Sequence, residues 1–316
     1  MTNRKIRSRL SKFLSNPFSI VKRVGEKGFL NWIPDALYLK IVYRAETGKR
    51  LDLKHPKTYN EKLQWLKLYD RRPEYTMMVD KYEVRKYVAE KIGEEYLIPL
   101  IGVYDSVDEI PWEELPDKFV LKCTHGSGSN IICLDKKRLD VEEAKKKLGK
   151  WMKKNWYWFG REWAYKKIVP RIICEEYLTE NGKAPDDYKF MCFNGVPRVI
   201  QVHRDRYGNH TQDYYDIGWK RINMTNNKVP ISNCELPKPE NFDEMVDISR
   251  KLSRDTLYSR IDLYNIIGRI FFGEITLYPT SGFTLLEPEE FEVVFGDWIS
   301  LENNENGGFL CPKKSQ

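Results

Sequence analysis

Apolar residues recur at helical spacing through much of the first third of the chain. This spacing predicts three helices, over residues 32–46, 58–70 and 79–93. In the third of them Asp80 is the expected N-cap, Glu83 completes a start that resembles a capping box, and Gly93 ends the pattern. Two further helices are predicted over residues 141–155, ahead of the aromatic run WMKKNWYWFGREW, and over residues 240–253.

Short apolar runs with β-branched residues predict strands elsewhere. They begin with YLIPLIGVYDS and FVLKC, and after Pro170 they dominate the chain as RIICEEYL, DYKFMCFNG, PRVIQVHRD, TQDYYDIGW, YSRIDLYNI and RIFFGEITLYP. The last two runs are joined by a short turn, so they are expected to pair as a hairpin. The tail ENNENGGFLCPKKSQ has the composition of a disordered segment.

Composition limits the class of protein. The 316 residues are 41% hydrophobic, enough for a packed core, and no apolar run approaches the roughly 18–20 residues that span a bilayer. Four of the six cysteines (Cys123, Cys133, Cys174 and Cys192) lie in apolar runs and are expected to be buried, reduced thiols, which favours a cytoplasmic location. No Cys or His spacing indicates a zinc site.

The net charge of +7 is concentrated at the start of the chain. Residues 1–27 hold eight of the 53 basic residues and one of the 46 acidic residues, so the remainder carries 45 of each. Within this leader an apolar stripe alternates with basic positions: Ile6, Leu10, Phe13 and Leu14. We expect either peripheral contact with the anionic inner face of the plasma membrane or packing against the protein's own body. The neutral remainder predicts no nucleic-acid partner.

The segment FVLKCTHGSGSNIICL (119–134) joins two predicted strands through a glycine-rich loop. A Walker A loop ends in GK[ST] and opens a helix, whereas here Lys122 precedes the glycines and a strand follows. A Rossmann glycine loop also opens a helix. The remaining alternatives are a hairpin that covers a triphosphate through backbone N–H groups and Lys122, and an ordinary hairpin turn.

Four other features favour the phosphate-binding alternative. Lys81 opens a predicted helix, and IICEEYL resembles a hinge that holds an adenine edge. Arg260 and Asp262 are two residues apart in one strand, so they face the same side. Glu274 lies in the neighbouring strand, and two acids on paired strands can hold Mg²⁺ against a triphosphate. The alternative for each acid is a surface carboxylate.

This ordered series resembles the ATP-grasp superfamily, and in particular its TupA-like branch of the teichuronopeptide-biosynthesis type. The resemblance runs from about Tyr59 to about Trp298 and rests on TYNEKLQWLKLYD, VDKYEVRKYVAEKIGEEYLIPL, FVLKCTHGSGSNII, YWFGREW, PRIICEEYL, DYKFMCFNG and FGEITLYPTSGF. It implies an α+β fold in which two subdomains clasp ATP between antiparallel sheets, with a helical N-terminal region.

The resemblance also implies roles for individual residues. Lys81 and Lys122 match the nucleotide lysines, and Arg260 the arginine that steadies the transferred group; Lys189 is a further phosphate or acceptor contact. The phosphate-covering loop and the adenine hinge match two runs of residues: His125, Gly126, Ser127, Gly128 and Ser129, then Glu175, Glu176, Tyr177 and Leu178. Asp262 and Glu274 match the metal ligands. Where the superfamily usually has Asn, this chain has Thr276, a poorer ligand.

The resemblance further implies an order of segments along the chain. These are a leader (1–27), a helical region (28–75), an ATP-grasp region (76–303) divided into a glycine-loop and hinge subdomain (119–178) and a metal and acceptor subdomain (179–303), and a flexible tail (304–316).

The implied activity is an ATP- and Mg²⁺-dependent carboxylate–amine ligase that modifies a bacterial surface polysaccharide, with a carboxylate-bearing sugar or amino acid as acceptor. A kinase with the same nucleotide clasp and a glycosyltransferase are the enzymatic alternatives, and a non-catalytic scaffold is the third. The chain contains no Asp-x-Asp pair of the glycosyltransferase type. The cluster Trp156, Trp158 and Trp163 is either a sugar platform or core packing.

Overall fold

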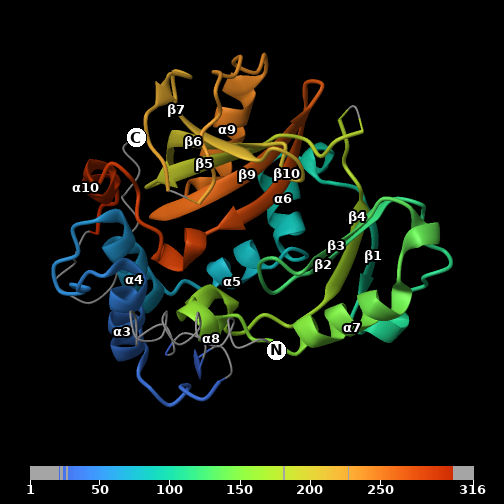
Figure 1. Ribbon diagram of the computed structural model, residues 1–316, viewed down its shortest axis with the longest axis horizontal. Helices are drawn as coiled ribbons and strands as arrows, with labels where there is room; N and C mark the ends of the chain where they lie inside the picture. Colours follow the sequence, from blue (N-terminus) through green and yellow to red (C-terminus); the bar gives the residue numbers. More distant parts are fainter. Residues whose placement is uncertain (1–20, 22–23, 26–27, 181, 227, 302–316) are drawn as a thin grey trace, which may run out of the picture.

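The structure is a computed structural model that describes residues 21, 24–25, 28–180, 182–226 and 228–301. Within these residues the chain forms two antiparallel sheets, which confirms the predicted α+β class (Figure 1). The leader, apart from residues 21 and 24–25, and the tail 304–316 lie outside the described residues.

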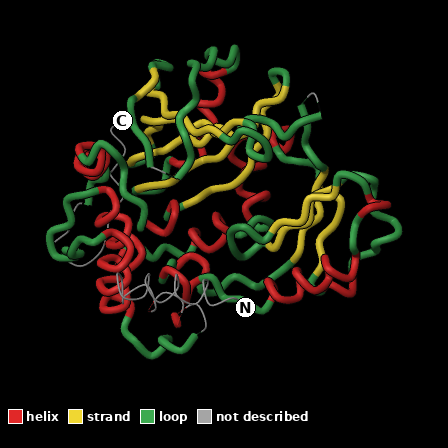
Figure 2. The backbone as a smooth tube through the Cα atoms, in the orientation of Figure 1, coloured by secondary structure: helices red, strands yellow, loops and turns green. Residues whose placement is uncertain are grey.

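The smaller sheet has the strand order β1-β4-β2-β3. Its strands are β1 (Leu100–Tyr104), β2 (Phe119–Cys123), β3 (Asn130–Cys133) and β4 (Ile172–Glu176). The predicted glycine-loop hairpin is confirmed, because β2 pairs with β3 from Phe119↔Cys133 to Lys122↔Asn130. Alternate residues of β2 are buried against helix α7 (Val141–Met152), which lies along the outer side of this sheet in Figure 2. The sheet includes β1, which lies ahead of the range 119–178.

The larger sheet has the strand order β10-β9-β5-β6-β7-β8. Its strands are β5 (Asp187–Phe193), β6 (Val196–Arg204), β7 (Thr211–Asp216), β8 (Arg221–Ile222), β9 (Tyr258–Ile266) and β10 (Arg269–Thr276). The predicted pairing of the last two strands is confirmed, and Glu274 lies directly opposite Asp262. A bulge between Phe272 and Glu274 interrupts the register there.

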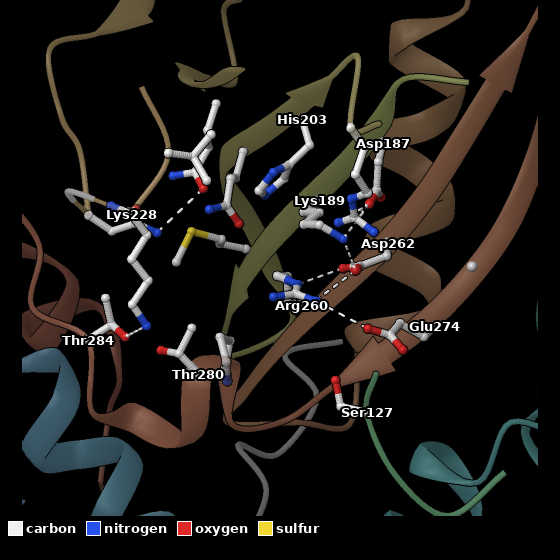
Figure 3. Close-up of a pocket in the computed structure, with 18 of the residues that line it drawn as sticks. Ser127, Asp187, Lys189, His203, Lys228, Arg260, Asp262, Glu274, Thr280 and Thr284 are labelled. Carbon is white, nitrogen blue, oxygen red and sulfur yellow. Dashed lines mark hydrogen bonds and ion pairs between the residues drawn. The ribbon is translucent and has the colours of Figure 1, made fainter. Parts of the chain in front are cut away.

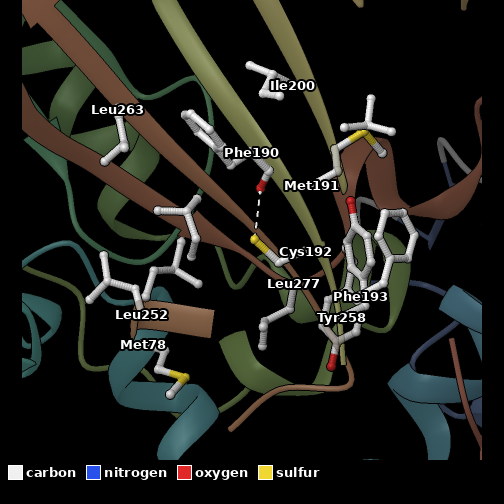
Figure 4. Packing of buried hydrophobic residues seen from close by; sticks show 14 of the residues in the cluster. Met78, Phe190, Met191, Cys192, Phe193, Ile200, Leu252, Tyr258, Leu263 and Leu277 are labelled. Atoms are coloured by element: carbon white, nitrogen blue, oxygen red, sulfur yellow. Dashed lines mark hydrogen bonds between the residues drawn. The ribbon is translucent and has the colours of Figure 1, made fainter. Parts of the chain in front are cut away.

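The two faces of the larger sheet have different surroundings. Lys189 and Met191 of β5 face a cavity, and Figure 3 shows Lys189 pointing into it. The alternate residues Phe190 and Cys192 are fully buried on the opposite face. There they pack with helix α9 (Phe242–Ser253) and α5 (Glu74–Val79) in one apolar core (Figure 4). The helical face therefore stabilises the sheet, and the cavity face is left for polar side chains.

The helical N-terminal region is confirmed in outline. Helices α3 (Asp35–Thr47) and α4 (Tyr59–Tyr69) match the predicted ranges closely, and Thr58 and Glu61 form a capping box at the start of α4. The helix predicted from residue 79 instead begins at Val84 as α6 (Val84–Ile92). The carboxylate of Asp80 accepts hydrogen bonds from the N–H groups of Tyr82 and Glu83, at 2.8 and 3.2 Å, and so stabilises a turn ahead of the helix.

Several elements differ from the sequence prediction. The carboxylate of Glu83 is 2.6 Å from Arg171 and does not return to a capping box. Helices α8 (Tyr157–Gly160) and α10 (Glu290–Trp298) were not predicted. A Cβ at Gly296 of α10 would lie 2.0 Å from the carbonyl oxygen of Lys57, so only glycine permits this close approach. The four cysteines expected to be buried thiols are buried and unpaired, and no described helix is long and apolar enough to cross a bilayer.

The turn after β10 has an unusual backbone. Thr280, Ser281 and Gly282 have φ values of 48°, 57° and 59°, a left-handed conformation that is costly for the two residues with a Cβ. Side chains of α4 hold this turn. Gln64 Nε2 donates to the carbonyl oxygens of Ser281 and Gly282, at 3.1 and 2.7 Å.

Lys67 of α4 completes this buried polar network. Its ammonium donates to the carbonyl oxygen of Ser281 at 2.7 Å, to Ser281 Oγ at 2.9 Å and to Gln64 Oε1 at 2.9 Å, although the residue is fully buried. Burial raises the pKa of nearby Glu162, and the charge of Lys67 opposes that rise. A Cβ at Gly160 would lie 1.9 Å from Ser281 Oγ, so α8 also approaches the turn closely. The N-terminal helices therefore fix the backbone at the end of β10.

We expect Lys67→Met to lower the free energy of unfolding by about 3 kcal/mol, because removing one partner leaves buried polar groups uncompensated. Urea denaturation measures this loss. The matched control is Lys86→Met on helix α6, where Lys86 is 82% exposed and the change is expected to cost less than about 0.5 kcal/mol. Equal losses for the two variants would contradict a stabilising role for the Lys67 network.

Candidate active site

Two rows of side chains cross the larger sheet. The strand register places one residue per strand directly opposite the next, in the order Glu274, Asp262, Lys189, Gln201 and Tyr214. A parallel row is formed by Tyr264, Asp187, His203 and Gln212. Neighbouring strands are about 4.8 Å apart, so each row is a continuous strip of polar groups. All nine residues line one cavity.

The cavity has a volume of about 410 Å³ and is lined by both sheets and by the turn after β10. The smaller sheet and its glycine loop contribute Lys122, Ser127, Gly128 and Asn130. In Figure 3, Ser127 lies opposite the carboxylates of the larger sheet. Pro279 and Thr280 of the left-handed turn line the same cavity.

Asp262 is the centre of the charged end of the cavity. Its carboxylate accepts from Arg260 Nε at 2.6 Å and Nη2 at 2.7 Å, and it also contacts the ammonium of Lys189. The Lys189 ammonium is also 2.7 Å from Oδ2 of Asp187. The same oxygen is 3.0 Å from Nη2 of Arg206. Burial raises the pKa of Asp262, and Arg260 and Lys189 oppose that rise. Acids and bases thus alternate, so each buried charge has a partner.

Glu274 extends this charged end to strand β10. Its carboxylate is 3.4 Å from Lys81 Nζ and 3.4 Å from Arg260 Nη2. Burial acts to raise its pKa, but Lys81 and Arg260 outweigh burial and hold the pKa at about 2. Glu274 is therefore ionised at neutral pH. The hydroxyl of Thr276 lies 3.3 Å from Glu274 and 3.1 Å from Arg260, so all three groups meet at one point.

The charged end fits a hard divalent cation. Mg²⁺ usually binds one or two carboxylates and completes its shell with water and phosphate oxygens. Asp262 and Glu274 supply two carboxylates on directly paired residues, and Thr276 adds a hydroxyl at the same place. In the described part of the chain no three His, Cys, Asp or Glu side chains form a metal cage. A cation here would take its other ligands from solvent and substrate.

The two predicted nucleotide lysines have partners within the protein. Lys122 Nζ is 2.7 Å from Glu175 Oε2, and Lys81 Nζ donates to the carbonyl oxygen of Gly126 at 2.7 Å. Lys81 thereby joins the glycine loop to Glu274 across the cavity. Both lysines line the cavity.

The glycine loop divides into a cavity edge and an anchored part. Ser127 and Gly128 line the cavity. His125 is buried and contacts the carbonyl oxygen of Trp151 at 3.1 Å, and the carbonyl oxygen of Ser129 accepts from the N–H of Cys123 at 3.1 Å. A Cβ at Gly126 would lie 1.8 Å from the indole nitrogen of Trp156, so that ring packs directly on the loop. Only the tip of the predicted loop therefore faces the cavity.

The predicted hinge is also divided. Glu175 is buried, and its carboxylate contacts Lys122 and, at 3.1 Å, Arg85. The next three residues line a second cavity of about 100 Å³ together with apolar residues of the smaller sheet; they are Glu176, Tyr177 and Leu178. Lys122 and Asn130 line both cavities, so the second cavity adjoins the first.

The two alternatives for the tryptophan cluster are distinguished by position. None of Trp156, Trp158 and Trp163 lines the main cavity as the described residues define it. The buried guanidinium carbon of Arg161 lies 4.6 Å from the centre of the Trp158 ring. Trp156 packs on the glycine loop. Core packing therefore describes these rings better than a sugar platform.

Sequence reasoning missed the end of the cavity formed by β6 and β7. Gln201, Gln212 and Tyr214 line it, and Asn226 and Lys228 lie beside them. One observation could have identified these residues: Gln201 lies directly opposite Lys189, and the sequence already indicates Lys189 as a site residue. Register between strands carries that information, and a single sequence does not show it.

Solved structures that are similar include D-alanine–D-alanine ligase from Bacillus anthracis complexed with ATP (15% identity, TM-score 0.41, covering 71% of this chain and 63% of that chain). D-Alanine–D-alanine ligase from Helicobacter pylori has 12% identity and a TM-score of 0.39, covering 72% of this chain and 60% of that chain. L-Amino acid ligase from Bacillus licheniformis has 14% identity and a TM-score of 0.38, and the match covers 65% of this chain and 44% of that chain.

The match spans less than two thirds of the length of each of these three proteins. A search of curated proteins found no match. A family model described as TupA-like ATPgrasp matches residues 61–300, which confirms the resemblance drawn from the sequence motifs. Since this match covers well over half of the chain, the chain belongs to the TupA-like ATP-grasp family.

Proposed function

We propose that this chain is an ATP- and Mg²⁺-dependent carboxylate–amine ligase. The observation that carries the proposal is the pair of carboxylates, Asp262 and Glu274, which lie directly opposite one another on neighbouring strands. Both line the cavity, and three cations contact them: Lys81, Lys189 and Arg260. Phosphoryl transfer requires this kind of site, because it depends mainly on positioning and charge neutralisation. The neighbouring cavity at the hinge offers apolar side chains on which an adenine ring can pack, including Leu178 and Val120, beside polar groups.

In the proposed reaction the γ-phosphoryl group of ATP passes to a substrate carboxylate oxygen and ADP leaves. An amine then attacks the acyl carbon, phosphate leaves, and the amine loses a proton. Lys122 and Lys81 hold the triphosphate, with backbone groups of Ser127 and Gly128 above it. Lys189 and Arg260 position the acceptor carboxylate and steady the charge on the transferred group. Asp262, Glu274 and Thr276 would hold Mg²⁺, which would supply positive charge to offset the phosphate oxygens.

The chemistry of the protein's existing ion pairs supports this assignment. Lys122 and Lys81 now contact Glu175 and Glu274, so a triphosphate would compete with carboxylates for both lysines. When Lys81 turns to phosphate, Glu274 is released to bind the cation. Nucleotide and cation would therefore bind more tightly together than separately.

We further propose that the acceptor is a carboxylate-bearing sugar or amino acid of a bacterial surface polysaccharide, as the sequence resemblance implies. A kinase with the same nucleotide site would release ADP without an amine. ADP release that requires both a carboxylate acceptor and an amine separates the ligase from the kinase.

We expect Lys122→Ala to weaken ATP binding about tenfold, since it removes a charge-assisted contact to phosphate. Isothermal titration calorimetry measures the affinity. Lys136→Ala is the matched control, because Lys136 follows the hairpin and donates to the carbonyl oxygens of Glu113 and Leu115. If both variants bind ATP equally, Lys122 does not hold the nucleotide.

Asp262→Asn and Glu274→Gln are each expected to lower ATP turnover at least about a hundredfold, because the cation loses a charged ligand. ADP release is measured with thermal unfolding as a check on the fold, and the exposed Asp243→Asn serves as control. Thr276→Asn should keep or raise Mg²⁺ affinity. A marked loss of Mg²⁺ affinity in that variant would argue against Thr276 as a ligand.

We also propose that residues 1–27 attach the enzyme to the inner face of the plasma membrane. Two aromatic side chains just after this leader support the proposal: Phe29 is 69% exposed and Trp32 is 79% exposed. Aromatic rings of this kind insert at the membrane interface, and basic residues add attraction to anionic lipid.

The full chain should sediment with anionic vesicles at low salt and detach as salt screens the charges. Deleting residues 1–27 should abolish sedimentation and spare activity on a soluble acceptor. Neutral vesicles are the control. Failure of the full chain to sediment with anionic vesicles at low salt would disprove membrane attachment.

A further inference from the structure

The aromatic segment around helix α8 takes no part in the proposed chemistry, yet it contacts the active site at two points. We call residues 156–162 the bridging segment. At its start, the ring of Trp156 packs on the glycine loop, because a Cβ at Gly126 would lie 1.8 Å from the indole nitrogen. Near its end, a Cβ at Gly160 would lie 1.9 Å from Ser281 Oγ in the turn after β10. These two contacts are one helical turn apart, a rise of about 6 Å.

Both contacted segments are parts of the cavity wall. The glycine loop contributes Ser127 and Gly128, and the turn after β10 contributes Pro279 and Thr280. The residues that the bridging segment contacts are the immediate neighbours of these in the sequence. Closely packed groups cannot interpenetrate, so a shift of the bridging segment would displace backbone on two sides of the cavity.

Helix α3 holds the bridging segment from another side. The hydroxyl of Tyr157 donates to Asp35 Oδ2 at 2.6 Å, and the hydroxyl of Tyr38 donates to the carbonyl oxygen of Phe159 at 3.1 Å. The guanidinium carbon of the fully buried Arg161 lies 4.4 Å from the centre of the Tyr38 ring. The bridging segment is therefore fixed against α3 and can keep the loop and the turn in one relative position.

The contact with the glycine loop is made by an indole nitrogen that lacks a hydrogen-bond acceptor. Among the residues that the structure describes, Trp156 Nε1 is buried and donates to no group. Such a donor costs about 1–3 kcal/mol, so the ring is held where it is by packing. Lys81, which lines the cavity, donates to the carbonyl oxygen of Gly126 at 2.7 Å. Gly126 is thus held by Trp156 as well as by Lys81.

We propose that the bridging segment fixes the glycine loop and the turn after β10 relative to one another, with Trp156 and Gly160 as its positioning residues. Neither residue lines the cavity as the described residues define it, so both act through their contacts with Gly126 and Ser281. The role of the loop in covering a nucleotide rests on the proposed function, whereas the link between the loop and the turn does not.

Hydrogen–deuterium exchange of the full chain, measured by mass spectrometry without ligand, tests the link. Gly160→Ala adds a methyl group at the turn end of the bridging segment. The amides of residues 125–129, beside its other end, should then exchange at least about fivefold faster. Gly149→Ala on α7 is the matched control, because a Cβ there would lie in open space and exchange should not change. Unchanged exchange of residues 125–129 in Gly160→Ala would overturn the proposal.

A second variant tests the link from the opposite end if Gly160→Ala does not fold. Trp156→Ala removes the ring from the loop and should also speed exchange of residues 280–283. Residues 258–266 of β9 are the internal reference, since their exchange reports unfolding of the core. The matched control is Trp112→Ala, whose indole nitrogen likewise lacks an acceptor in the described part of the chain but packs with the core of the smaller sheet. A response to Trp156→Ala confined to the loop would overturn the proposal.

Calorimetry with ATP and Mg²⁺ separates this inference from the proposed function. Gly160→Ala and Trp156→Ala should each weaken ATP binding about fivefold, since the binding-competent position of the loop becomes less populated. If the unaltered chain binds no ATP but both variants alter exchange at the far end, the proposed function fails and the link stands. If ATP binds and neither variant alters exchange at the far end, the proposed function stands and the link fails.

Discussion

Charge compensation around Asp262 is the interaction on which the cavity depends. A carboxylate on the inner face of a sheet is tolerated only where cations and hydrogen-bond donors offset the loss of water. Here Arg260 binds it through two nitrogen atoms and Lys189 contacts it from the next strand. The same two cations reach Glu274 and Asp187, so removing one member leaves the others unbalanced. The sheet therefore keeps a polar face in its middle, and the helices pack on the other face.

This arrangement also explains why the two sheets face one another across a cavity. Lys81 extends from the segment before α6 to both the glycine loop and Glu274, and so contacts both sides. Lys122 is tied to Glu175 within the smaller sheet. Each lysine makes an ion pair that a more highly charged ligand can replace. The protein without ligand is thus held together by the groups that would bind the ligand.

Much of this could be predicted from the sequence, because the relevant signals are local. The spacing of Arg260 and Asp262 places them on one side of a strand, and the short turn to the next strand brings Glu274 beside them. Other features depend on register or on distant packing, which no local pattern contains. Gln201 and Tyr214 look like ordinary polar or aromatic positions until β6 and β7 are aligned with β5. Likewise, a helix was predicted from residue 79 because the apolar spacing continued upstream, although Asp80 bonds to a turn before it.

The buried contacts of Lys67 have a consequence for how this sequence can vary. The left-handed turn at Ser281 receives hydrogen bonds from Gln64 and Lys67, which lie 217 and 214 positions earlier in the chain, and Gly160 leaves the space that its hydroxyl occupies. A change at any one of these four positions leaves a donor, an acceptor or a void that only a compensating change elsewhere can remove. Related chains should therefore vary at these positions jointly, and a chimaera that takes its N-terminal helices from one relative and its C-terminal strands from another would inherit mismatched halves of this contact.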